Sequence, residues 1–180
     1  MRNARRAVIR AFILVAVCAS ASLVWGAGGG ILNDPTTYLT TAQPGQPPSR
    51  FQAWVRMPSI QFKLNTVAGK YRIIPIVIEN QGAEAVALSG ATDRVVVTVG
   101  GRKVPAILEL FKADRPLWDS WDLSLRRPLT YPAQVRPDES VMIYAFVRVA
   151  DVPEAPESLD FTIRSLGRTL ALRKLPAMAA

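Results

Sequence analysis

Apolar and polar residues alternate in several stretches of this chain. In 141–149 every odd-numbered position is apolar, as at Val141, Ile143 and Val147, and Arg148 lies at one of the even-numbered positions between them. A period of two places successive side chains on opposite faces of a strand. The same period recurs in the segments 94–99, 104–110, 161–163 and 170–172. We therefore expect half-buried antiparallel strands in each of them.

Short turns join these predicted strands. Gly100-Gly101 separates two of them, and glycine accepts the positive φ that tight hairpin turns require. Ser165-Leu166-Gly167 joins the final pair. Both junctions predict hairpins.

The segment Tyr71–Ile78 is apolar on both faces, which predicts a strand that is covered on both sides. Pro75 lies inside it and cannot donate to a ladder, so we expect a local irregularity there. Asn80-Gln81-Gly82 ends the strand with turn-forming residues.

About seven strands at this spacing, with one short helix candidate, predict an all-β domain. We expect an immunoglobulin-like antiparallel β-sandwich over 51–175, preceded by an N-terminal signal or anchor helix. The segment 28–50 is rich in Gly, Pro and Thr, and we expect it to be a flexible linker.

Residues 1–27 have the pattern of a signal peptide or signal-anchor. Ala19-Ser20-Ala21 supplies small residues for cleavage, and the apolar run 11–32 is long enough to span a bilayer if cleavage fails. The basic residues at the start are Arg2, Arg5, Arg6 and Arg10. We expect an extracytoplasmic protein, either periplasmic or secreted, or one anchored to the membrane by residues 11–32.

Removal of the leader changes the charge balance. The chain has 22 basic and 14 acidic residues, a net charge of +8. Four arginines lie in the leader, which leaves 18 basic against 14 acidic residues, or +4. The remaining charges are mixed in sign, which is typical of a solvated surface rather than of a nucleic-acid interface. We expect no nucleic-acid partner, and membrane contact only through an uncleaved N-terminal segment.

Two residue types that carry much enzyme chemistry, histidine and cysteine, do not occur in the part of the chain that follows the predicted leader. The chain has no histidine, and its single cysteine, Cys18, lies in the leader. These absences exclude Ser-His-Asp and Cys-His catalysis and metal sites built on imidazole or thiolate. No glycine-rich phosphate-binding motif occurs. We therefore predict no catalytic, cofactor-binding or metal-binding residues, and no cofactor.

Carboxylates are the remaining candidates for catalysis. Glu154 with Glu157, or Asp119 with Asp122, have the residue types of a glycosidase pair. No surrounding motif supports either pair, and we interpret them as surface residues.

The segment 113–125 contains two of the four tryptophans, Trp118 and Trp121, spaced for a short helical turn that Asp114 can cap. They have two interpretations: an aromatic platform for a glycan or peptide, or core residues that close one end of the sandwich. A third, a calcium site formed by Asp114, Asp119 and Asp122, matches no known loop spacing. The candidate partner-binding residues are Trp118, Trp121, Asp119 and Asp122.

The order of features over about residues 70–175 resembles the immunoglobulin-like domains of unknown function in bacterial envelope and secreted proteins. The segments that carry the resemblance are 76–82, 97–103, 135–140, 144–147 and 152–153. The resemblance implies fold and compartment, and it brings no catalytic residues. Many such proteins carry a lipid-attachment signal, whereas here Val17 precedes Cys18, which does not fit such a signal.

The leading hypothesis is an exported, non-enzymatic binding or structural module of the cell envelope, which presents loops or sheet edges to a protein or glycan. One alternative is a carboxylate-type hydrolase that acts on envelope polysaccharide. Another is an accessory or assembly subunit of an envelope complex, which requires an exposed, unpaired strand edge.

Overall fold

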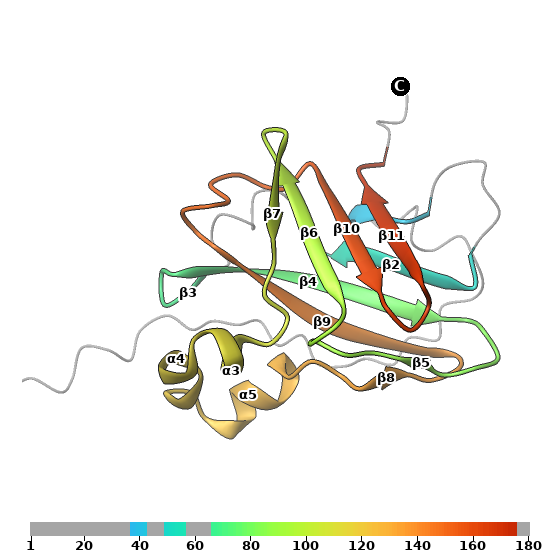
Figure 1. The fold of residues 1–180 in the computed structure, drawn as a ribbon, viewed down its shortest axis with the longest axis horizontal. Helices are drawn as coiled ribbons and strands as arrows, with labels where there is room; N and C mark the ends of the chain where they lie inside the picture. Colours follow the sequence, from blue (N-terminus) through green and yellow to red (C-terminus); the bar gives the residue numbers. More distant parts are fainter. Residues whose placement is uncertain (1–36, 43–48, 57–65, 176–180) are drawn as a thin grey trace, which may run out of the picture.

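The computed structural model of the chain describes residues 37–42, 49–56 and 66–175 (Figure 1). The predicted leader and membrane anchor lie outside these residues. The described helices and strands are β1 Thr37–Thr40, β2 Phe51–Arg56, β3 Thr66–Val67, β4 Tyr71–Asn80, β5 Val86–Ala87, β6 Arg94–Val99, β7 Arg102–Pro105, α3 Leu110–Ala113, α4 Arg115–Asp119, α5 Leu123–Leu129, β8 Gln134–Val135, β9 Glu139–Arg148, β10 Ser158–Ile163 and β11 Arg168–Arg173.

The larger sheet is antiparallel throughout and curls on itself. Its strand order is β7-β6-β10-β11-β1-β2-β4-β9, and β3 pairs with the start of β4. In Figure 1, β6, β10 and β11 cross β2, β4 and β9 at a steep angle. The two ends of the sheet meet where Ile107 and Phe146 exchange backbone hydrogen bonds of 2.7 and 2.8 Å.

The all-β prediction is therefore confirmed. The strands belong to one continuous curled sheet, and the short pair β5-β8 forms a separate one. The immunoglobulin-like type of the domain stays a prediction.

The main core lies inside the curl and is built by the alternation seen in the sequence. Val95, Val97 and Val99 of β6 are all buried, as predicted. The largest fully buried side chains in this core are Leu39, Ile74, Ile76, Ile78, Ile143, Leu159, Phe161, Ile163 and Leu172. Gly100 and Gly101 form the predicted turn at φ of +53° and +73°.

Strand β4 is buried on both faces, as predicted, but Pro75 causes no irregularity. Pro75 lies opposite Tyr144, and the register between β4 and β9 runs from Tyr71 to Asn80 without a shift. Since β9 occupies one edge of β4 completely, β2 and β3 share the other edge. The ladder with β2 ends at Ile76, so the missing N–H of Pro75 lies outside it.

The sheet begins earlier than the sequence predicted. Strand β1 lies inside the segment 28–50 that was expected to be a linker, and Leu39 and Thr40 in it are fully buried. It lies between β2 and β11. The linker prediction is therefore wrong for Thr37–Thr40, because pairing with these two strands orders a short segment.

Three short helices cover the outer face of β4 and β9, where the sequence predicted a single helical turn. They enclose a second cluster of buried residues, Tyr71, Ile73, Leu110, Trp118 and Phe146. The predicted strand 104–110 is wrong beyond Ile107, because the chain leaves the sheet there and Leu110 begins α3. This cap explains why β4 is apolar on both sides.

Candidate functional site

A shallow, open hollow of about 530 Å³ lies at one end of β4, beside the start of α4. The β3–β4 turn, the start of α4 and the end of β9 contribute its walls. Its lining residues are Gly69, Lys70, Tyr71, Asp114, Arg148, Val149 and Ala150.

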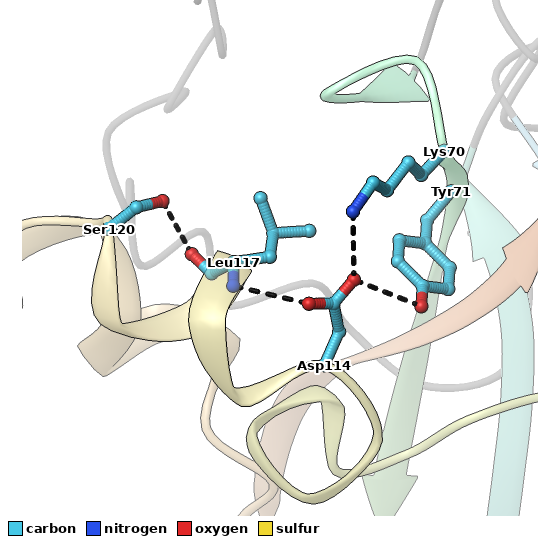
Figure 2. Close-up of polar contacts among 5 residues, drawn as sticks. All are labelled: Lys70, Tyr71, Asp114, Leu117 and Ser120. Atoms are coloured by element: carbon cyan, nitrogen blue, oxygen red, sulfur yellow. Dashed lines mark hydrogen bonds and ion pairs between the residues drawn. The ribbon is translucent and has the colours of Figure 1, made fainter.

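Asp114 is one of the lining residues, and Figure 2 shows its polar contacts. Its carboxylate accepts the backbone N–H of Leu117 at 3.2 Å, which caps the start of α4. It also accepts the hydroxyl of Tyr71 at 3.3 Å and lies 3.5 Å from the ammonium of Lys70. The side chain is 15% exposed. Helix, sheet and turn therefore meet at one carboxylate.

These contacts favour the ionised form of Asp114. The Leu117 hydrogen bond is the main cause that lowers the pKa of Asp114 below its ordinary value. Partial burial opposes this effect, and Lys70 and Tyr71 add to it. A carboxylate with a lowered pKa that is committed to three donors is poorly suited to act as a general acid.

The outer part of the hollow is positively charged. Arg148 lies directly opposite Tyr71 in the β4–β9 register, and it is exposed. In the described part of the chain, its guanidinium has no hydrogen-bond or ion-pair partner. The Lys70 side chain is 63% exposed, and Asp114, at 3.5 Å, is the only described residue that its ammonium binds. Two cations are thus available to a ligand.

Trp118 and Trp121 lie side by side on the helical cap. Their ring centroids are 5.7 Å apart, and the Trp118 ring also lies 6.1 Å from that of Phe111. Trp118 is 8% exposed and belongs to the second buried cluster, while Trp121 is half-buried against it. This geometry places Trp118 in the core. A partner-binding role for the pair stays a prediction.

The aspartates of the same segment are not gathered into one site. Asp119 lies 2.7 Å from Arg115 and 3.6 Å from Arg126, and both arginines are on the cap. Asp122 occupies the position before α5, where its side chain makes no capping hydrogen bond. Within the described ranges, no group of three acidic, histidine or cysteine residues is arranged to hold a metal ion.

Glu157 is committed to a turn, where its carboxylate accepts the N–H of Gly100 at 3.1 Å. Glu154 is exposed. The structure therefore gives the pair Glu154 and Glu157 no shared hydrogen bond that would favour catalysis.

Lys70, Tyr71 and Arg148 were not predicted as site residues. Their proximity depends on the register between β4 and β9, which aligns Tyr71 with Arg148. Asp114 was recognised from the sequence as a capping residue, and that part is confirmed.

No model of a known protein family matches the chain, and no curated protein sequence matches it. A crystal structure of a conserved hypothetical protein from Bacillus anthracis matches with a TM-score of 0.37 and 12% identity. The match covers 75% of this chain and 94% of that one. A likeness at this level carries no argument about fold or function. Among the described residues, no helix is long and apolar enough to cross a membrane.

Proposed function

We propose that this protein is an exported, non-enzymatic binding or structural module of the bacterial cell envelope, with an immunoglobulin-like domain. The N-terminal leader pattern supports export. The hollow at the end of β4 is the proposed binding site, since two exposed cations, Lys70 and Arg148, line it. The partner is an envelope protein or glycan.

The observation that carries this proposal is the state of Asp114. It caps α4 and binds Tyr71 and Lys70, so its role in the hollow is to hold these groups in place. A hydrolase would instead need a carboxylate able to gain and lose a proton during the reaction. A site that offers cations to a ligand, and whose carboxylate is already hydrogen-bonded within the protein, fits binding better than catalysis.

Cell fractionation combined with mass spectrometry of the mature N-terminus tests the proposal. We expect the protein in the periplasmic, secreted or membrane fraction, with cleavage near Ala21 or an intact leader in the membrane. Recovery of the full-length chain in the cytoplasm would contradict export. A hydrolase activity that a single carboxylate substitution abolishes would contradict the non-enzymatic role.

One observation favours a second candidate, an accessory subunit that accepts a strand from a partner. Phe146 uses its backbone groups to bind Ile107 at the edge of β9 that faces away from β4. Backbone N–H and C=O groups alternate between the two edges of a strand, so those of Met142 and Tyr144 face the same edge as those of Phe146. Among the described residues they have no backbone partner there. Met142 is 42% exposed.

The two edges of the sheet differ in chemistry. Strand β7 carries Arg102, Lys103 and Pro105, which are residues that oppose strand addition, whereas no charged residue occurs in 140–147 of β9. Co-purification from solubilised envelopes tests this candidate. Met142→Lys should abolish capture of the partner, and Leu123→Lys, at the other large exposed apolar residue, should not. Equal capture by both variants would rule out docking at β9.

A further inference from the structure

We propose that the hollow binds a carboxylate-bearing sugar, of the uronic-acid type, within an acidic envelope glycan. The inference rests on the proposed function and assigns the chemical class of its ligand. Arg148 and Lys70 would bind the carboxylate, and Tyr71 and Asp114, which are joined by a hydrogen bond (Figure 2), line the same hollow.

The charge of the hollow matches a single carboxylate. Lys70 and Arg148 are positive and Asp114 is negative, so the lining carries one net positive charge. The guanidinium of Arg148 donates to no other described residue, and a guanidinium binds a carboxylate through two parallel hydrogen bonds. A phosphate monoester would bring nearly two negative charges to a lining that offers one.

The remaining hydrogen-bonding groups suit sugar hydroxyls. The Lys70 ammonium has three donors and, among the described residues, makes only a long contact to Asp114, so donors remain for a ligand. The Asp114 carboxylate accepts three hydrogen bonds of the roughly four it can accept, so a hydroxyl can donate to it. The lining also includes Val149 and Ala150, whose apolar surface can contact the C–H groups of a sugar ring.

Isothermal titration of the exported protein with trigalacturonic acid tests the inference. We expect saturable binding that weakens as salt is added, because the contact is between charges. Arg148→Gln should weaken it by about tenfold or more, and Lys70→Gln should weaken it less. Arg136→Gln is the matched control, because Arg136 is an exposed arginine beyond the opposite end of β9. An unchanged thermal midpoint for each variant shows that the fold is retained.

The comparison ligands separate the outcomes. Maltotriose, which lacks the carboxylate, should not bind. Equal affinity for inorganic phosphate or triglutamate would overturn the sugar assignment and leave a general anion site. Absent binding of trigalacturonic acid, or equal losses in Arg148→Gln and Arg136→Gln, would overturn the site itself. The export assay is unaffected by any of these results, so the two proposals fail separately.

Discussion

The hydroxyl of Tyr131 donates a 2.9 Å hydrogen bond to the carboxylate of Asp93, which is 2% exposed. The same carboxylate accepts the backbone N–H of Ser89 at 2.8 Å and that of Arg164 at 3.0 Å. Three loops that are distant in sequence are thereby joined at one end of the curled sheet. A buried carboxylate is tolerated there because three donors satisfy it.

Removing the Asp93 carboxylate should destabilise the protein. Asp93→Ala leaves the Ser89 and Arg164 amides and the Tyr131 hydroxyl without their acceptor, so we expect the free energy of unfolding to fall by about 3 kcal/mol. Urea denaturation measures the change. Asp119→Ala is the control, because its exposed ion pairs should contribute no more than about 1 kcal/mol. Equal losses would show that burial of Asp93 does not matter.

Tyr131 should make the protein sensitive to alkali. Burial, and then the neighbouring Asp93 charge, raise the pKa of Tyr131 above its ordinary value of 10. Above about pH 10 the unfolded chain loses this proton while the folded chain keeps it. The contribution of Tyr131 to the free energy of unfolding is therefore fully present below about pH 10. Above it, this contribution falls by about 1.4 kcal/mol per pH unit.

Denaturation curves between pH 8 and 11 check this prediction. Tyr131→Phe should lower stability at pH 8, because Asp93 loses a donor, and should flatten the alkaline slope. Tyr144→Phe is the comparison, since burial alone raises the pKa of Tyr144. Parallel slopes for the wild type and Tyr131→Phe would contradict a role for this hydroxyl.

Asp114 should produce the opposite dependence in acid. Its pKa is lowered below 3.8 in the folded protein, mainly by the Leu117 amide. Its contribution is thus present above the unfolded-state pKa and is lost as the pH falls through the folded-state pKa. Asp114→Asn should lose stability at pH 6, and its difference from the wild type should shrink as the pH falls below 3.8.

Asp122→Asn is the matched control for this measurement. Asp122 also precedes a helix, but its side chain makes no capping hydrogen bond. Its substitution should leave the acid limb of the stability curve unchanged. If both variants behaved alike, the Leu117 contact would not be the cause.

Local patterns predicted the strands in which every second side chain is buried in the core. In β6, Val95, Val97 and Val99 are buried as their alternation indicated, and Gly100 and Gly101 have the positive φ that the hairpin requires. These features depend on neighbouring residues alone. Strand β1 does not: Thr40 pairs with Arg173, more than a hundred residues away, and nothing within four residues reveals that partner.

The candidate hollow could not be predicted for the same reason. Asp114 was visible as a cap, but Lys70 of the β3–β4 turn and Tyr71 of β4 contact it only in the folded chain. Arg148 joins the same hollow through the register between β4 and β9. The sequence instead drew attention to Trp118, because tryptophans are common at interfaces. Its burial depends on how the helices cover β4 and β9.

The two tryptophans should therefore differ in what their removal does. Trp118 is buried against Phe111 and the outer face of the sheet, so Trp118→Ala should lower the free energy of unfolding by about 3 kcal/mol. Trp121 is half-buried, and its removal should cost about 1 kcal/mol. Denaturation curves and co-purification of partners from solubilised envelopes, made with the same variants, separate stability from partner binding. A platform role predicts that Trp118→Ala abolishes partner binding while its stability is unchanged; a core role predicts lost stability, with binding retained by the molecules that remain folded.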